Sequence, residues 1–113
     1  MHKITTLTKR ADFLAAAKSG LRRGTNSFNL QANPNALSSI RVGYTVSKHV
    51  SKLAVDRNRI KRRLKAAVKI AFADAKTGFD YVLIGKLEAK QRDMKLLIGD
   101  IKYALKKIHA EII

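Results

Sequence analysis

The sequence predicts an α+β fold in which helices cover one β-sheet. Residues 56–76 and 88–110 repeat apolar side chains at the spacing of a helix. Residues 40–47 and 80–86 carry the short alternating or continuous apolar patterns of strands. Helical and strand patterns follow one another in a single chain of 113 residues. This order is typical of a single-domain α+β or α/β sandwich.

A short helix is expected near the N-terminus. Residues 1–10 form a basic lead-in, and Asp12 is suited to cap the helix that follows. The helix runs to about Ser19, where Gly20 is a natural terminator. Phe13 is its one aromatic residue. Core packing is the ordinary role of such a residue, and stacking on a nucleobase is the functional alternative.

Two strand regions are expected on either side of a turn. Residues 22–32 contain the alternating stretch Phe28-Asn29-Leu30-Gln31, and residues 40–47 alternate more strongly. Asn33-Pro34-Asn35 between them is the clearest turn signal in the chain. The polar residues that point away from the core along these strands are Asn29, Gln31, Thr45, Ser47 and Lys48. Facing water and binding a ligand are equally good interpretations of them.

The next segment combines helical periodicity with a dense positive charge. It begins between Ser51 and Asp56 and runs to about Lys76. Six of the nine residues from Arg57 to Lys65 are cationic. The apolar face is made of Ile60, Leu64, Ala67, Val68, Ala71 and Phe72. The opposite face carries Asn58, Arg62, Lys65 and Lys69, with Arg59 and Arg63 on one flank.

This charge run indicates a binding surface. A solvated face is the ordinary interpretation of such a run, but no acidic residue lies between Arg57 and Lys69 to relieve the repulsion. Arginine dominates the run, which suits bidentate recognition of phosphate. The free N–H groups in the first turns of the helix add to this attraction.

The last two elements are a buried strand and an amphipathic helix. Residues 80–86 contain the continuous apolar run Tyr81-Val82-Leu83-Ile84, as expected for a strand covered on both faces. The helix spans about residues 88–110. Its apolar stripe is Met94, Leu97, Ile98, Ile101, Leu105 and Ile108.

The charge distribution favours a nucleic-acid partner. The formal net charge is +16. Residues 13–73 hold thirteen Lys or Arg against one carboxylate, Asp56, and so carry +12 of it. In a compact domain this concentrates positive potential on one side, as in a protein that binds a polyanion.

No catalytic or metal-binding constellation is recognisable in the sequence. His2, His49 and His109 are scattered, there is no cysteine, and no Gly-rich phosphate loop is present. We therefore expect a binding module with no catalytic residues and no metal site of its own. The sequence also lacks a transmembrane stretch and a secretory signal, so a cytoplasmic protein without membrane contact is expected.

The motifs resemble those of the protein subunit of bacterial ribonuclease P. Arg41-Val42-Gly43-Tyr44-Thr45-Val46-Ser47-Lys48 is similar to the strand that precedes the basic helix in that family. Arg57-Asn58-Arg59-Ile60-Lys61-Arg62 is similar to its basic signature. Asp12-Phe13 before Lys18-Ser19-Gly20 resembles the first helix, and residues 80–84 resemble the last strand.

The resemblance implies a fold and an activity. The fold is an α-β-β-β-α-β-α sandwich like the second domain of ribosomal protein S5, with a left-handed β-α-β crossover. The activity is hydrolysis of one phosphodiester of precursor tRNA, which removes the 5′ leader. In the family the RNA subunit is the catalyst and holds Mg²⁺, and the protein binds both RNAs. One protein per ribonuclease P RNA is expected.

The resemblance also assigns roles to residues. Contacts to RNA near the cleavage site fall to Arg57, Asn58, Arg59, Lys61, Arg62 and Lys65. The leader cleft, between the first helix and the sheet, would be lined by Phe13, Asn29, Gln31, Thr45, Ser47 and Lys48. Ala17, Asn29 and Gln31 stand where relatives often have apolar or aromatic residues. The cleft should therefore stack bases less and hydrogen-bond more.

Two other functions use the same features. A non-catalytic RNA-binding module of ribosomal type has the same charge distribution and the same expected fold. A DNA-binding domain would place the basic helix in the major groove. The DNA alternative is weaker, because the charge extends beyond the helix and no dimerisation element is recognisable.

Overall fold

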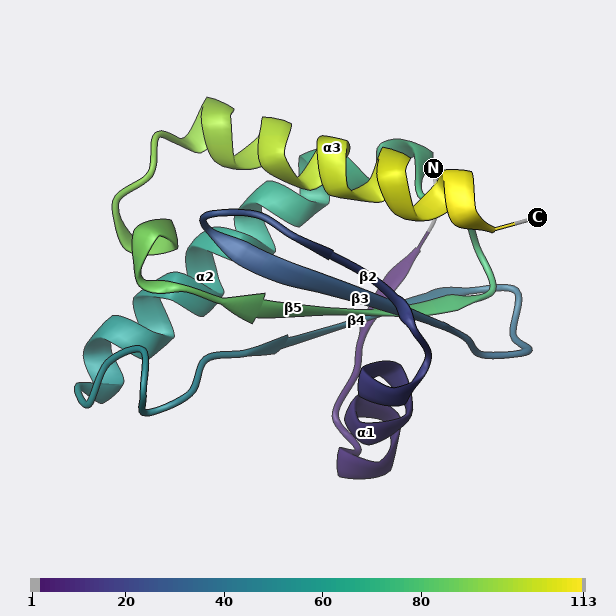
Figure 1. Cartoon of the computed structure of the whole chain (residues 1–113), viewed down its shortest axis with the longest axis horizontal. Helices are drawn as coiled ribbons and strands as arrows, with labels where there is room; N and C mark the ends of the chain where they lie inside the picture. Colours follow the sequence, from purple (N-terminus) through teal and green to yellow (C-terminus); the bar gives the residue numbers. More distant parts are fainter. Residues whose placement is uncertain (1–2, 113) are drawn as a thin grey trace.

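The computed structural model describes residues 3–112 and has five strands and three α-helices there (Figure 1). The strands are β1 (Ile4–Thr6), β2 (Leu21–Gly24), β3 (Phe28–Pro34), β4 (Ile40–Thr45) and β5 (Phe79–Gly85). The helices are α1 (Arg10–Lys18), α2 (Ala54–Ala71) and α3 (Met94–Glu111), with short 3-10 turns η1 (Phe72–Asp74) and η2 (Leu87–Lys90).

The strands form one mixed sheet in the order β1-β4-β5-β3-β2. β4 and β5 are parallel neighbours, with Ile40 opposite Phe79, and α2 makes the crossover that a parallel pair requires. β3 runs antiparallel to β5, with Phe28 opposite Gly85, and β2 closes a hairpin with β3. The α+β architecture predicted from the sequence, with helices layered on one sheet, is confirmed.

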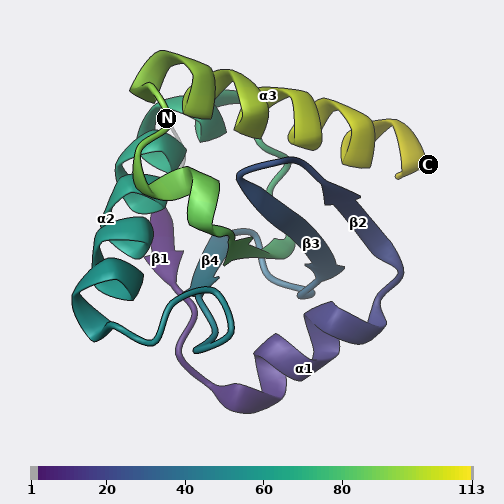
Figure 2. The same ribbon diagram turned by 60° about the vertical axis from the view of Figure 1, so that its left-hand side comes forward.

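Two helices cover one face of the sheet, and the third covers the other (Figures 1 and 2). α2 packs on β4 and β5, and α3 packs on β2 and β3. The main core between them and the sheet contains the predicted stripes. Its buried helical residues include Ile60, Leu64, Val68, Leu97, Ile101, Leu105 and Ile108, and they meet Phe28, Leu30, Ile40, Val42, Tyr81 and Leu83 of the sheet.

The opposite face is only lightly covered by α1. Its apolar contacts are a small cluster of Leu7, Ala16 and Val82, with Phe13 and Ile84 packed against it. Polar contacts add to the attachment of this helix. Arg41 makes two hydrogen bonds, of 2.7 and 2.6 Å, to the buried carboxylate of Asp80, and its Nη1 lies 3.5 Å from Asp12 of α1.

One strand was not predicted. Ile4–Thr6 lies within the basic lead-in and pairs in parallel with β4, so that Ile4 is opposite Ile40. Three residues are too few to show a period of two, and their pairing depends on a strand more than thirty residues away. Met1 and His2 of the lead-in lie outside the described residues.

Three element boundaries differ from the prediction. α1 begins at Arg10, so Asp12 lies in its first turn and not at its cap. β3 continues through Pro34, which is opposite Phe79 of β5 but lies beyond Ala32, the last residue that pairs with β2. The side of Pro34 toward β2 is therefore an open edge, where proline is tolerated. The last helix is interrupted before Met94, because the side chain of Asp93 accepts a 2.9 Å hydrogen bond from the N–H of Lys95 and caps a new helix.

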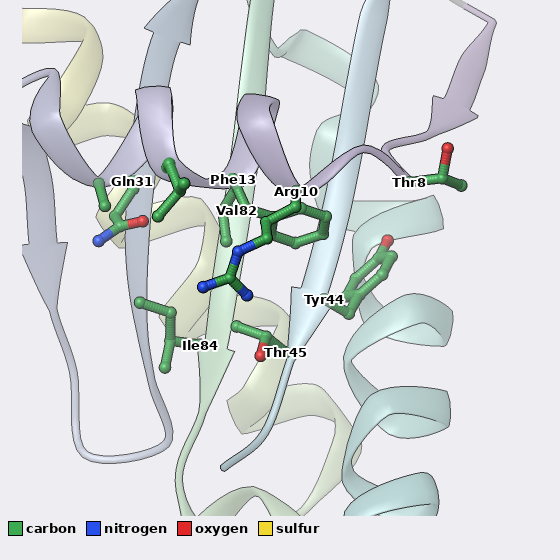
Figure 3. Close-up of a pocket in the computed structure, with 10 residues that line it drawn as sticks. Thr8, Arg10, Phe13, Gln31, Tyr44, Thr45, Val82 and Ile84 are labelled. Atoms are coloured by element: carbon green, nitrogen blue, oxygen red, sulfur yellow. The ribbon is translucent and has the colours of Figure 1, made fainter.

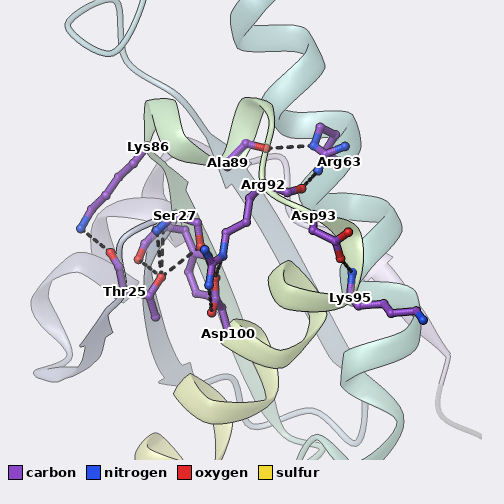
Figure 4. A network of polar contacts seen from close by, with 10 residues as sticks. Thr25, Ser27, Arg63, Lys86, Ala89, Arg92, Asp93, Lys95 and Asp100 are labelled. Atoms are coloured by element: carbon purple, nitrogen blue, oxygen red, sulfur yellow. Dashed lines mark hydrogen bonds and ion pairs between the residues drawn. The ribbon is translucent and has the colours of Figure 1, made fainter.

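A polar network joins the β2–β3 hairpin, η2 and the helices (Figure 4). Arg92 donates to both carboxylate oxygens of Asp100, at 2.6 and 3.1 Å, and Ser27 donates to the same group at 2.8 Å. Arg63 of α2 donates to the carbonyl oxygens of Ala89, at 2.9 Å, and of Arg92. Arg63 and Arg92 are therefore structural cations.

The last turns of α3 contain a neutral histidine. Nε2 of His109 lies 3.4 Å from the backbone nitrogen of Lys76 and 3.3 Å from the hydroxyl oxygen of Tyr81. Because a backbone N–H donates, Nε2 accepts and the ring is uncharged. Burial, and then the charge of Lys76, lowers the pKa of His109 below its ordinary value of 6.5. Asp74, Lys102 and Lys106 line the same groove.

We expect His109 to make the fold less stable in mild acid. Its folded pKa is depressed, so the unfolded chain binds the proton first, and the free energy of unfolding falls as the pH drops through 6.5. Urea unfolding at about pH 7.5 and about pH 5.5 measures this loss. His109→Gln keeps a hydrogen-bond acceptor but does not titrate. The variant should therefore lose less unfolding free energy than the wild type between these two pH values. An equal loss in both proteins would contradict the prediction.

Candidate nucleic-acid interface

The basic face of α2 is exposed, as the sequence predicted. The helix buries its apolar stripe, which turns the other side to solvent. Of the six predicted RNA contacts, Asn58, Arg59, Arg62 and Lys65 are exposed, whereas Arg57 and Lys61 are half-buried. Within residues 3–112, no carboxylate forms an ion pair with any of these six. Their positive charge is therefore available to an anionic partner.

Two arginines of this face are held in place by hydrogen bonds to the protein backbone. Arg57 donates to the carbonyl oxygen of Ser51 at 2.8 Å, and Arg59 donates to that of Lys90 at 3.2 Å. Asp56, the single acid of this region, pairs with Lys90 at 3.0 Å. The hydrogen bonds from Lys90 and Ser51 keep the pKa of Asp56 below its ordinary value. Arg62 is exposed and makes no hydrogen bond or ion pair with the residues that the structure describes.

A cleft of about 430 Å³ lies between α1 and the sheet (Figure 3). Arg10 and Phe13 reach into it from α1, and Gln31, Tyr44 and Thr45 reach into it from β3 and β4 (Figure 3). The lining is completed by Thr8, Leu14, Ala17, Val82 and Ile84. Apolar walls with a few polar groups suit a ligand with flat rings and a charged backbone.

Phe13 reaches the cleft because Gly43 has no side chain. A Cβ on Gly43 would lie 2.6 Å from two ring carbons of Phe13 and 3.2 Å from Cβ of Leu7. The ring thus packs directly on the backbone of β4 and lines the cleft at the same time. Phe13 combines the two roles that the sequence left open, since it packs and it remains accessible.

We expect Gly43→Ala to push the Phe13 ring into the cleft. The neighbouring space is open, so the cost in unfolding free energy should be near the lower end of the ~1–3 kcal/mol typical of overpacking. Urea unfolding of Gly43→Ala, Phe13→Ala and the double variant measures the coupling. The alanine at position 43 should cost less when Phe13 is absent. Strictly additive costs would show that the two residues do not interact.

Gln31 is placed to recognise a ligand. Only 8% of it is exposed, and its side chain extends from β3 into the cleft (Figure 3). Within residues 3–112 no side-chain hydrogen bond to it is formed, so its amide can pair with a ligand group. The sequence indicated a polar strand position. It could not show that α1 covers this position, because that contact is made between distant segments.

Three predicted cleft residues lie outside the lining. Asn29 is on the same face of β3 as Gln31 but lies two residues earlier on the strand, beside Gly24 of β2. Ser47 and Lys48 are exposed beyond the end of β4, where the chain leaves the sheet and turns. The resemblance assigned both residues to the cleft, but β4 ends at Thr45, before either of them.

Tyr44 lies between the cleft and the basic helix, a position that its place in an alternating strand did not predict. It lines the cleft on one side, and on the other a small cavity of about 80 Å³ that Lys65 and Lys69 of α2 also line. Burial raises the pKa of Tyr44, so its hydroxyl stays protonated and can donate. Arg10 was likewise missed, because it was assigned to the lead-in.

The described residues contain no cluster of three His, Asp or Glu side chains arranged to hold a metal ion. Two of the buried or half-buried carboxylates, Asp80 and Asp100, are already bound by arginines. In the same part of the chain, no helix is long and apolar enough to cross a membrane. What the site offers is exposed cations and a cleft that can bind an extended ligand.

Comparison with known proteins decides the family. The family model described as Ribonuclease P matches residues 1–109. The chain belongs to the ribonuclease P protein family. The ribonuclease P protein component of Ruegeria pomeroyi is 43% identical over 112 residues, covering 95% of this chain and 88% of the relative. That of Paramagnetospirillum magneticum is 42% identical over 114 residues, covering 96% and 85%.

Solved structures agree with this assignment. The ribonuclease P protein of Staphylococcus aureus superposes with a TM-score of 0.76 at 26% identity, covering 93% of this chain and 95% of that one. The fold of the Thermotoga maritima protein is equally similar, with a TM-score of 0.77 over 90% and 96% of the two chains. The chain is thus a protein component of ribonuclease P, the RNA–protein enzyme that processes precursor tRNA, and ribonuclease P RNA is its partner.

Proposed function

We propose that the exposed face of α2 binds ribonuclease P RNA while the cleft beneath α1 holds the 5′ leader of precursor tRNA. The observation that carries this proposal is the shared wall at Tyr44, which borders both the cleft and the cavity beside Lys65 and Lys69. Two RNA strands bound at these places would lie next to each other. The protein would then fix the leader relative to the catalytic RNA, with one protein acting on each RNA, in the cytoplasm where precursor tRNA is made.

The two sites suit different parts of RNA. Arg62 and Lys65 present unpaired positive charge to the phosphodiester backbone, with the bidentate geometry that arginine provides. In the cleft, Phe13 offers a ring for one nucleobase, and the amide of Gln31 pairs with a base edge. Arg10 supplies a cation for the leader phosphates. Because Ala17 and Gln31 offer no ring to a nucleobase, hydrogen bonding contributes more than stacking at these two positions.

We assign the catalytic Mg²⁺ to the RNA subunit. The described residues do not fit a protein-held ion, since they form no suitable cluster of ligands and Asp80 and Asp100 are engaged by Arg41 and Arg92. When bound by RNA, Mg²⁺ supplies the activation of the hydrolytic water. The residues of this chain position the leader and neutralise phosphate charge, which lowers the repulsion between the two RNAs.

Reconstitution tests the proposal. The chain alone should leave precursor tRNA intact, and adding it to a bacterial ribonuclease P RNA at low Mg²⁺ should accelerate correct 5′ cleavage. Substrates with a long leader and with a single leader nucleotide separate the two sites. Arg62→Ala should slow cleavage of both substrates, because it weakens RNA binding. Gly43→Ala should slow only the long-leader substrate, because it blocks the cleft.

Lys95→Ala is the matched control, since this lysine is exposed on the first turn of α3, outside both proposed sites. Equal slowing of the two substrates by Gly43→Ala would remove the cleft assignment. If the protein left cleavage unchanged and bound ribosomal RNA fragments selectively, the ribosomal-type module would be the better interpretation.

A further inference from the structure

A second group of cations surrounds an exposed tyrosine, where β2 meets α3. Nη2 of Arg23 donates to the hydroxyl oxygen of Tyr103 at 3.2 Å, and its Cζ lies 5.7 Å from the centre of the ring. Nζ of Lys107 lies 5.6 Å from the same centre. Tyr103 is nevertheless 48% exposed. We name Arg23, Tyr103 and Lys107 the β2–α3 cluster.

The two acids of α3 nearest to the cluster in sequence, Asp100 and Glu111, are not paired with its cations. In residues 3–112, neither Arg23 nor Lys107 forms an ion pair. Asp100, one turn before Tyr103 on α3, is occupied by Arg92 and Ser27. Residues 74–113 carry a formal charge of only +2, with eight cations and six acids. Of these acids, Asp80 and Asp100 pair with arginines and Asp93 caps α3, whereas Glu111, one turn after Lys107, forms no ion pair among the described residues.

The tyrosine holds the two cations near one another. Each gains a cation–π contact with the ring, and these contacts oppose the mutual repulsion of two like charges. The hydrogen bond from Arg23 also lowers the pKa of Tyr103. Arg23 uses one of its five N–H donors on this hydroxyl, which leaves others for an anion. The ring thus holds two cations, each within 5.7 Å of its centre, where they can meet the phosphates of one RNA backbone.

This cluster lies away from the site described above. β2 is one edge of the sheet and β1 is the other, and α2 packs on β4 and β5 near the β1 edge. In Figure 2, α2 lies on the left of the sheet and β2 on the right. The cluster, at the β2 edge, therefore lies apart from the exposed basic face of α2.

We propose that the β2–α3 cluster is a second RNA-binding surface, which holds the phosphodiester backbone of a separate stretch of ribonuclease P RNA. This inference rests on the proposed function in taking that RNA as the partner. The charge of the cluster is complementary to a polyanion, and phosphates bound by Arg23 and Lys107 relieve the repulsion between them. The protein then contacts the RNA on two edges of its sheet and bridges two of its segments.

Salt-dependent binding to ribonuclease P RNA alone, without substrate, tests the proposal. Lys107→Glu should lower the slope of log affinity against log salt by about one or slightly more, because a phosphate contact is lost. Lys95→Glu makes the same charge change at the other end of α3 and should leave the slope close to wild type. Tyr103→Leu keeps every charge but releases the two cations, and it should also weaken binding.

Hydroxyl-radical footprinting gives an independent measurement. Lys107→Glu should expose RNA nucleotides that differ from those exposed by Arg62→Ala. Equal effects of Lys107→Glu and Lys95→Glu would overturn the second surface, as would an effect seen only when precursor tRNA is present. In that case, weaker RNA binding by Arg62→Ala would still support the proposed function. Thermal unfolding of each variant checks that the fold is intact, and Lys107→Glu remains informative if Tyr103→Leu unfolds.

Discussion

The affinity of this chain for ribonuclease P RNA should fall about a thousandfold between roughly 50 and 200 mM salt. Each phosphate that a Lys or Arg neutralises releases condensed counterions, and engagement of about six phosphates gives a loss of this size. The exposed cations around the basic helix supply that number. They are Lys48, Lys52, Arg59, Arg62, Lys65 and Lys69.

Filter binding over a salt series measures the slope. Arg62→Ala should reduce it by about one and weaken binding to different RNA sequences by a similar factor. Arg62 lies opposite the buried stripe of α2, so the free energy of unfolding should hardly change. An affinity that stays constant over this salt range would show that the positive face of α2 does not contact phosphate.

Leu64→Ala should destabilise the fold by roughly 2–5 kcal/mol. Leu64 is fully buried in the main core, where α2 approaches β5. The approach is close because Gly85 has no side chain. A Cβ there would lie 3.3 Å from Cδ1 of Leu64 and 2.6 Å from Cγ2 of Ile60. Truncation of the leucine leaves a cavity that packed helices and strands on every side cannot readily fill.

Urea unfolding gives the size of this effect, and the neighbouring residue provides the control. Lys65 is exposed, so Lys65→Ala should change the free energy of unfolding by less than about 0.5 kcal/mol. Its RNA affinity should drop instead. Similar unfolding midpoints for Leu64→Ala and the wild type would mean that the apolar stripe of α2 is not buried.

The periodic elements could be predicted because their signals are local. Ile60, Leu64 and Val68 recur on one helical face, and the structure buries all three. That periodicity also predicted that Arg62 and Lys65 face solvent. The continuous run from Tyr81 to Ile84 likewise predicted a strand covered on both faces, which is β5.

Features that depend on distant contacts could not be predicted. The pairing of Ile4 with Ile40 joins two segments whose local patterns say nothing of each other. The same holds for Arg10 and Tyr44, which line the cleft only because α1 folds over the sheet, where it packs on β3 and β5. The alternation along β3 correctly predicted which face of the sheet Gln31 lies on. It could not show that Asn29, on the same face, lies outside the lining of the cleft.

The two faces of the sheet contribute unequally to the hydrophobic core. The α2–α3 face contains nearly all of the buried apolar residues, whereas α1 is attached by a small cluster and by the contacts of Arg41. Substitutions around the cleft consequently put little of the folding free energy at risk. Positions such as Ala17 and Gln31 can therefore be substituted with less effect on the fold than positions in the core beneath α2 and α3.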